Sequence, residues 1–280
     1  MGNNDATGAD LGSVTSERIE HILHICVDRH TKMNGFTPEM FQALEAALTH
    51  LDTDADLWAG VISFVGPHST AGLDLPRFAA SMRAAPQPSA PNVTPTSGTV
   101  SDVTPGIDAF ALKRRCSKPV VMAVQGITFT IGIEMMLAAD IVVAADDCRF
   151  CQMEPKRGLA VFGGAHVRYV ERAGWGNAMY HLLRADEFGA ARALQLGFVQ
   201  EVVPAGQQVS RALAIAEEIC ALAPVAVQEI KRGALRYLEA GEQAAFAEIP
   251  TMRARSAGSD DFSEGLASFR EKRAPRFTGR

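Results

Sequence analysis

Three short stretches of the sequence contain only apolar and small neutral side chains. They are residues 57–65, 119–124 and 141–145. Uninterrupted apolar runs of this length are typical of strands that are buried on both faces of a sheet. Thr37-Pro38-Glu39 is a strong helix start, because threonine caps the first helical turn and proline fits there. Together with a strand that we expect over residues 18–27, these elements favour an α/β layered architecture.

Composition divides the rest of the chain. Residues 1–17 are small and polar and lack the basic and apolar regions of a signal peptide, so we expect a disordered leader. Residues 18–204 predict the α/β core. Within it, residues 84–106 are rich in Pro, Ser and Thr and predict a mobile loop, followed by a short helix over residues 107–115. Residues 205–280 carry apolar side chains at helical spacing and predict a helical C-terminal part.

Charge and cysteine content narrow the class of function. The net charge of −5 argues against binding to nucleic acid or to a membrane surface, because phosphate contacts need a basic face. No apolar run in the sequence approaches the ~20 residues of a membrane span. The five cysteines are odd in number and scattered, which predicts reduced thiols and a cytoplasmic protein. Cys148 and Cys151 should point to opposite faces of a strand, so we expect no metal site.

Two turns in the sequence suit the binding of a developing negative charge. We expect a turn over residues 126–132 and a helix over residues 133–139. A helix N-terminus presents unpaired backbone N–H groups and a partial positive charge, which stabilise an oxyanion. A second turn, over residues 68–74, contains Gly72 and follows a predicted strand. Taken alone, the first pattern fits an ordinary strand–helix turn better than an oxyanion site, and the second pattern is no more specific.

Seven blocks of the sequence together resemble the enoyl-CoA hydratase/isomerase (crotonase) family. In chain order they are RHTKMNGF (29–36), AGLDL (71–75), KPVVMAVQG (118–126), AADI (138–141), FCQME (150–154), LGFV (196–199) with VVP (202–204), and EG (264–265) with FREKR (269–273). No single block is decisive, but the ordered set is specific. The resemblance implies an α/β fold of the crotonase type, a spiral of ββα units with an α-helical C-terminal trimerisation part.

The resemblance also implies the catalytic groups. The backbone N–H groups of Leu73 and Ile131 would bind the thioester oxygen and stabilise an enolate. Glu134 and Glu154 would form an acid/base pair, in which one polarises a water that attacks C3 and the other delivers a proton to C2. Family members that keep both carboxylates are typically hydratases, so the resemblance favours an enoyl-CoA hydratase, which adds water reversibly, in syn fashion, to a 2-enoyl-CoA.

The same resemblance implies how the substrate is held. The positions that would contact CoA are Lys32, Ala71, Gly72, Asp74, Phe269 and Lys272, the last two often reaching a neighbouring subunit. The implied partner is an acyl-CoA thioester, and no separate cofactor is expected, because coenzyme A is part of the substrate. The implied assembly is a homotrimer or a dimer of trimers.

The sequence departs from the family pattern at Thr130-Ile131-Gly132, where a run of glycines is usual. β-Branched residues resist positive φ, so the amide pair requires a helical conformation at this point. An enoyl-CoA double-bond isomerase and a non-catalytic acyl-CoA-binding protein therefore stay open as alternatives.

Taken without the resemblance, the two glutamates also fit structural roles. Glu134 fits a solvated helix face. Glu154 fits a loop carboxylate paired with Lys156 or Arg157. The exposure of the two side chains decides between these interpretations and catalysis.

Overall fold

The computed structural model describes residues 11–83 and 106–280. Its strands are β1 (Ser13–Ile19), β2 (Ile22–Asp28), β3 (Ala59–Phe64), β4 (Val120–Val124), β5 (Ile127–Phe129), β6 (Ile141–Ala145), β7 (Arg149–Cys151), β8 (Phe188–Gly189) and β9 (Glu201–Val203). Its helices are α2 (Pro38–Thr53), α3 (Leu75–Arg83), α4 (Ile131–Ala138), α5 (Ala165–Arg184), α6 (Ala190–Gln195), α7 (Gln208–Cys220), α8 (Pro224–Ala257) and α9 (Asp260–Glu271), with the 3-10 helices η1 (His30–Lys32) and η2 (Glu154–Arg157).

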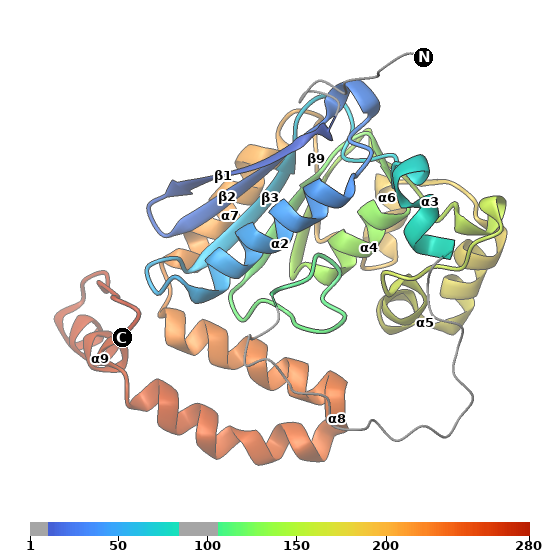
Figure 1. Cartoon of the computed structure of the whole chain (residues 1–280). Helices are drawn as coiled ribbons and strands as arrows, with labels where there is room; N and C mark the ends of the chain where they lie inside the picture. Colours follow the sequence, from blue (N-terminus) through green and yellow to red (C-terminus); the bar gives the residue numbers. More distant parts are fainter. Residues whose placement is uncertain (1–10, 84–105) are drawn as a thin grey trace, which may run out of the picture.

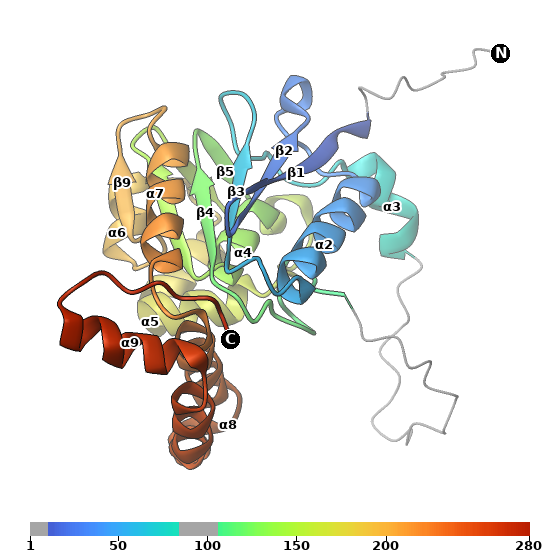
Figure 2. The ribbon, with the colours of Figure 1, turned by 90° about the vertical axis from the view of Figure 1, so that its left-hand side faces the viewer.

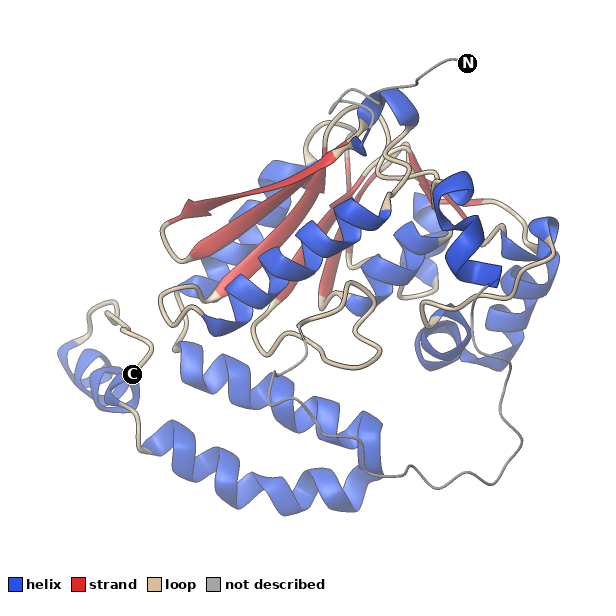
Figure 3. Ribbon diagram, viewed as in Figure 1, coloured by secondary structure: helices blue, strands red, loops and turns tan. Residues whose placement is uncertain are grey.

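The strands form a large sheet and a small sheet (Figure 1, Figure 3). The large sheet has the order β1-β2-β3-β4-β6-β9 and is parallel except for β1, which pairs antiparallel with β2. The small sheet has the order β5-β7-β8. The chain passes from β4 to β5 and then into α4, and from β6 to β7 and then into α5. Each turn of the spiral therefore contributes one strand to each sheet and then a helix, as the ββα prediction requires.

Helices cover both faces of the large sheet (Figure 2). On one face, α7 packs Ala212 and Ala216 against alternate strand residues such as Val61 and Val121. On the other face, α2 and α4 bury their apolar side chains in the main core. All six residues of β3 are buried, which explains why the sequence shows a continuous apolar run there instead of alternation.

The start of α2 follows the prediction. The Thr37 side chain accepts a hydrogen bond from the Met40 amide at 3.3 Å, and Pro38 occupies the first turn. The helix extends to Thr53 with Leu44, Leu48 and Leu51 on its buried face. The cap and the apolar spacing are local signals, which is why the sequence predicts this helix well.

Helix α4 is buried on every side. Each residue from Ile131 to Leu137 is buried, and the helix has no polar face to orient it. A helix that is apolar all round belongs in the interior of a domain. Glu134 is the one titratable residue within these seven, so a carboxyl group is placed deep inside the protein.

Two predicted elements are wrong near the N-terminus. The strand predicted over residues 18–27 is a hairpin of β1 and β2, which reverses at Glu20 with φ 51°. The turn lacks the Asn-Gly or Gly-Gly pair that is typical of a hairpin with a two-residue loop, so the sequence gives no signal for the reversal. Because β1 begins at Ser13, the boundary of the predicted disordered leader at residue 17 is also wrong. Residues 1–10 of that leader, and residues 84–105 of the predicted mobile loop, lie outside the described residues.

Two further elements differ from prediction. The helix predicted over residues 107–115 is a turn, because the Asp108 carboxylate accepts hydrogen bonds from the backbone amides of residues 110 and 112–114. Aspartate competes with helix formation in this way. The turn predicted over residues 126–132 contains strand β5 and the first residues of α4. The turn at Asp108 is local, whereas β5 depends on pairing with β7, which is distant in sequence.

The C-terminal part is helical, as predicted, but its middle helix is longer than expected. Helix α8 runs for 34 residues with a change of direction at Gly241, and it projects away from the sheets (Figure 1). The sequence pattern after residue 223 predicts a helix from Pro224 to about Leu238, and the observed helix continues to Ala257. Among the described residues, none of the helices combines the length and the apolar character needed to cross a membrane.

Candidate active site

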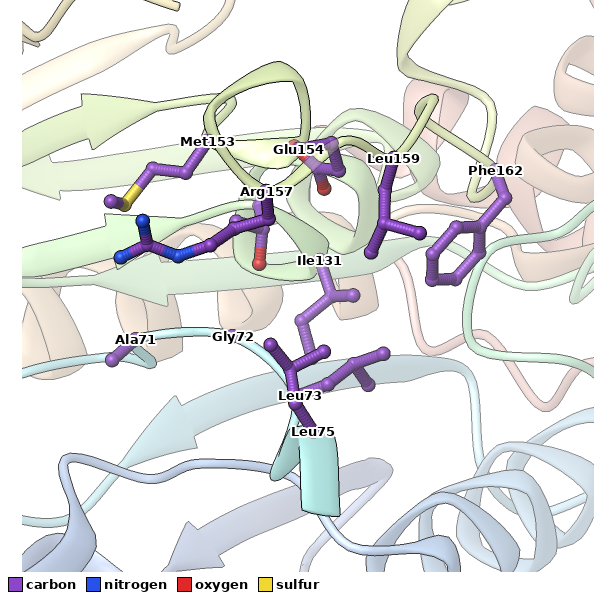
Figure 4. A pocket seen from close by; sticks show the side chains of 11 residues that line it. Ala71, Gly72, Leu73, Leu75, Ile131, Met153, Glu154, Arg157, Leu159 and Phe162 are labelled. Atoms are coloured by element: carbon purple, nitrogen blue, oxygen red, sulfur yellow. The ribbon is translucent and has the colours of Figure 1, made fainter. Parts of the chain in front are cut away.

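Three segments of the chain enclose a cavity of about 240 Å³. Residues 71–75 form one wall, residues 153–162 form the opposite wall, and the start of α4 lies between them (Figure 4). Most of the lining is apolar. The contributing side chains are those of Leu73, Leu75, Ile131, Met153, Leu159 and Phe162. A mostly apolar cavity with a few polar groups is the usual form of a small-molecule site.

The two amides predicted to bind an oxyanion both belong to residues that line this cavity. Ile131 is the first residue of α4, so its N–H has no partner within the helix. Leu73 follows Gly72, whose φ of +120° turns the chain sharply. Within the described residues, neither amide donates a hydrogen bond. Both donors are thus available to a bound group, as an oxyanion site requires.

In the Thr130-Ile131-Gly132 segment, where a run of glycines is usual in the family, the strained backbone conformation belongs to Thr130. Ile131 is helical, so its β-branched side chain is compatible with the amide pair. Thr130 instead has φ 50° and ψ −115°, a region that residues with a Cβ rarely adopt. Its hydroxyl lies against Gly72, where an added Cβ would stand 2.6 Å from Thr130 Oγ1. Non-glycine residues held in such conformations cluster at functional sites.

Glu134 is fully buried and held by a turn at the start of α5. Its Oε1 accepts hydrogen bonds from the Gly163 amide at 2.8 Å and the Ala165 amide at 3.2 Å. Burial raises the pKa of this carboxyl, while the two amides and the charge of Arg168 oppose the rise. Its Oε2 has no hydrogen-bond partner among the described residues. The interpretation of Glu134 as a solvated helix-face residue is wrong.

Glu154 is the first residue of η2 and lines the cavity. The residue is 5 % exposed, and burial raises the pKa of its carboxyl to about 7, with a further increase from the negative charge of Glu134. Its Oε2 also lacks a hydrogen-bond partner in the part of the chain that the structure describes. Among the ion pairs of the described residues there is none between Glu154 and Lys156 or Arg157, and the glutamate is buried, so the interpretation as a surface ion pair is wrong.

The environments of the two glutamates differ in a way that matters for proton transfer. Glu134 receives two amide hydrogen bonds and lies within the field of a cation, both of which favour the ionised form. Glu154 is buried with less compensation, which favours the neutral form near neutral pH. Paired carboxyls whose surroundings separate their pKa values are suited to act as base and acid.

The predicted CoA-contacting residues fall into three groups. Ala71 and Gly72 line the cavity. The carboxylate of Asp74 is engaged by Arg29 at 2.8 Å and by Arg77 at 3.4 Å, so it holds the 71–75 turn in place.

Lys32 is exposed on η1 and is not part of the lining of the cavity, although the carbonyl of the next residue, Met33, accepts a hydrogen bond from the Ala71 amide at 2.9 Å. Phe269, which is 84 % exposed, and Lys272 lie at the end of α9, far from α4 and α3 within this chain (Figure 1, Figure 2). The structure does not bring these three residues to the cavity of their own chain.

Several residues of the site escaped sequence reasoning. Met153, Arg157, Leu159 and Phe162 form the wall opposite residues 71–75, and Arg157 places a cation at the cavity (Figure 4). Met153 precedes Glu154 and the other three lie within eight residues after it, so their closeness to Glu154 in sequence was the available signal. Arg168 is buried behind Glu134, and no local pattern in the sequence distinguishes it from the other arginines.

A cavity at the N-terminus of a buried helix, with two buried carboxyls beside it, is the kind of site found in crotonase-fold enzymes. Comparison with known proteins agrees. The family model for enoyl-CoA hydratase/isomerase matches residues 17–280, and the chain belongs to this family.

Relatives with assigned names include both hydratases and isomerases. Enoyl-CoA hydratase EchA19 of Mycobacterium tuberculosis is 33% identical over 267 residues, covering 94% of this chain and 96% of the relative. The human mitochondrial Delta(3,5)-Delta(2,4)-dienoyl-CoA isomerase is 31% identical over 239 residues, covering 81% and 72%. Among solved structures, a probable enoyl-CoA hydratase/isomerase from Mycobacterium abscessus superposes with a TM-score of 0.86 at 38% identity, covering 95% of this chain and 98% of that one. The crotonase-type fold class is therefore confirmed.

Proposed function

We propose that the protein is an enoyl-CoA hydratase that adds water reversibly to a 2-enoyl-CoA thioester. One observation supports this most directly: Glu154 lines the cavity with Leu73 and Ile131, and Glu134 is buried one turn further along α4. Among the described residues, each glutamate has an oxygen without a hydrogen-bond partner, and neither the Leu73 nor the Ile131 amide donates a hydrogen bond. Hydration of an enoyl thioester needs one group for water, one group for a proton and donors for the thioester oxygen. The site offers all three.

The proposed reaction follows from the two environments. Glu134, which is stabilised in its ionised form, accepts a proton from water as the water oxygen bonds to C3. The electron pair of the double bond moves toward C2 and the thioester oxygen, whose negative charge the Leu73 and Ile131 amides stabilise. Glu154, whose pKa of about 7 keeps a substantial fraction protonated near neutral pH, transfers its proton to C2. Water is consumed, and the proton gained by Glu134 replaces the one lost by Glu154 through exchange with solvent.

For the CoA portion, we propose that Ala71 and Gly72 contact the substrate next to the thioester, since both line the cavity. Asp74 contributes by holding their turn through Arg29 and Arg77. Lys32 is proposed to contact a phosphate, because a lysine presents a mobile point charge suited to phosphate.

Phe269 and Lys272 can contribute only from a neighbouring copy of the chain, so the proposal includes a trimer or a dimer of trimers. Large apolar side chains stand exposed on the outer helices, as expected of surfaces that associate. They include Trp175 and Leu183 on α5 and Ile230 on α8. Light scattering should give the mass of three or six chains, and a monomeric mass at micromolar concentration would contradict this part of the proposal.

Isomerisation is the second candidate, because relatives named as dienoyl-CoA isomerases match most of this chain. An isomerase would move the double bond of the substrate without net uptake of water. A non-catalytic acyl-CoA-binding protein would bind the thioester and return it unchanged.

The deciding experiment follows the loss of the conjugated thioester absorbance of short and medium 2-enoyl-CoA substrates. Wild type should turn over, and Glu134→Gln and Glu154→Gln should each lose at least ~100-fold in rate, as expected for general acid–base groups. Glu217→Gln is the matched control, because Glu217 is an exposed residue of α7 on the other face of the sheet. It should keep the wild-type rate.

Each other outcome has a clear meaning. If wild type leaves 2-enoyl-CoA unchanged but converts a 3-enoyl-CoA to its 2-enoyl isomer, the protein is an isomerase. Tight binding of both thioesters without turnover identifies a binding protein. Full hydratase activity in both Glu134→Gln and Glu154→Gln would refute the proposed mechanism.

A further inference from the structure

A buried arginine stands behind Glu134, and the proposed reaction does not use it directly. Arg168 is the fourth residue of α5 and is 7 % exposed. A positive charge near a helix N-terminus opposes the helix dipole, and burial of a guanidinium costs several kcal/mol unless it is compensated. Its position therefore calls for a compensating negative group and for hydrogen-bond acceptors.

The acceptors are three backbone carbonyls from two separate segments. Arg168 Nη1 donates to the Gly163 carbonyl at 3.1 Å, and Nη2 donates to the carbonyls of Phe110 at 2.5 Å and Ala111 at 3.3 Å. The second segment is the turn organised by Asp108. The guanidinium therefore joins this turn to the start of α5.

The segment at the start of α5 is also the one that holds Glu134. Gly163 presents its carbonyl to Arg168 and its amide to Glu134 Oε1. Gly164 has φ +96°, and an added Cβ there would stand 2.9 Å from Arg168 Nη1, so the guanidinium fits closely against the turn. An added Cβ at Gly163 would collide with the Glu134 carboxylate. The arginine and the glutamate thus both hydrogen-bond to Gly163, within the turn formed by residues 163–165.

The charges around the pair indicate which negative group compensates the arginine. Facing Arg168 are Glu134 from α4, Asp108 and Arg115 from residues 106–116, and Glu171 from its own helix. Asp108 is occupied by its own turn, and Glu171 is exposed. Facing Glu134 are Arg168 and, with the same sign as itself, Glu154. Glu134 is therefore the buried negative group that the Arg168 charge can stabilise.

We propose that Arg168 is a positioning residue for Glu134: it fixes the turn that binds the carboxylate and supplies a positive charge that favours the ionised form of this carboxylate. The inference rests on the proposed role of Glu134 as the base in hydration. The Arg168 guanidinium donates to the backbone carbonyls of Gly163, Phe110 and Ala111, so it acts through the turn that holds the glutamate and not on the substrate.

The test compares Arg168→Met and Arg168→Lys with the control Arg172→Met. Arg172 lies one turn further along α5, is partly buried and has no contact with the Glu134 turn. Arg168→Met should lower kcat at least ~10-fold with KM nearly unchanged, because a misplaced base slows the chemical step. The acid limb of its kcat/KM profile should move to higher pH by about one unit, because the opposite charge is gone. Arg168→Lys should restore most of the pH shift, and Arg172→Met should behave as wild type.

A second measurement decides the question without turnover. The midpoint of urea unfolding at pH 8 is compared for Arg168→Met, Glu134→Gln and the double variant. If the arginine stabilises the ionised carboxylate, its removal lowers the midpoint more in the wild-type background than in the Glu134→Gln background.

The possible failures are distinguishable. Equal losses in the two backgrounds, or a slower Arg168→Met enzyme with an unshifted pH profile, would show that Arg168 is only structural and would overturn the inference. A wild type that does not hydrate 2-enoyl-CoA removes the proposed function, while the unfolding comparison still decides whether Arg168 and Glu134 are coupled.

Discussion

Replacing Thr130 with glycine should stabilise this protein, although glycine substitutions usually destabilise. Thr130 holds φ 50° and ψ −115° directly before α4, where a β-branched residue is strained. Strain of this kind is worth about 1–3 kcal/mol. Thr130→Gly removes the Cβ and with it the source of the strain.

The gain is reduced by the greater freedom of glycine in the unfolded chain, about 0.5–1 kcal/mol. The net expectation is a free energy of unfolding higher by about 0.5–2 kcal/mol. For a domain of this size, the melting temperature should rise by roughly 1–4 °C. Both quantities can be measured by urea denaturation and by calorimetry at pH 7.

The matched control is Thr130→Ala. It removes the hydroxyl and the methyl group but keeps the Cβ, so it keeps the strained backbone. The two variants should therefore separate, with only glycine stabilising. If glycine destabilises the protein, or if both variants change the unfolding free energy equally, the backbone at Thr130 is not strained and the argument fails.

Three further predictions follow from burial and capping. The pKa of Glu154 rises on folding from 4.5 to about 7, so the stability that its neutral form provides is complete below pH 4.5 and is lost as the pH rises through 7. Between pH 5 and pH 8, urea denaturation should show that wild type loses up to about 3 kcal/mol of unfolding free energy that Glu154→Gln does not lose. The same pH dependence in both proteins would contradict the assignment. Thr37→Ala should lower the unfolding free energy by about 1 kcal/mol while Thr37→Ser should not, because the hydroxyl caps α2. Burial raises the pKa of the Cys116 and Cys148 thiols to about 12, so mass spectrometry after iodoacetamide treatment should find them modified only in unfolded protein, and labelling of the native state would argue against this packing.

The sequence predicted those parts of the fold that depend on neighbouring residues. The buried strands and the Thr37 cap are set by apolar runs and by a side chain three residues from its partner. The reversal at Glu20 and the turn at Asp108 were missed. In the first, the usual turn residues are lacking, and in the second a carboxylate satisfies backbone amides that a helix would have used.

The candidate site shows the same division. The two candidate glutamates and both amide positions came from ordered motifs. The structure places Leu73, Ile131 and Glu154 in the lining of one cavity, and Glu134 is buried one helical turn beyond Ile131 in α4. The surroundings of Glu134 could not be predicted, since the amides that hold its carboxylate lie 29 and 31 residues further along the chain. The contacts of Arg168 could not be predicted for the same reason, because two of the carbonyls that accept its hydrogen bonds lie 57 and 58 residues away.

The complete burial of α4 has a consequence for how the protein loses activity. The helix carries the Ile131 amide and Glu134, and each of its residues from 131 to 137 is enclosed by the core. Opening it to solvent would require the surrounding layers to separate, so its amide hydrogens should exchange with deuterium only through global unfolding. Catalysis and the native fold should then disappear at the same denaturant concentration. As denaturant is added, we therefore expect no populated form in which the rest of the fold persists while α4 is unfolded.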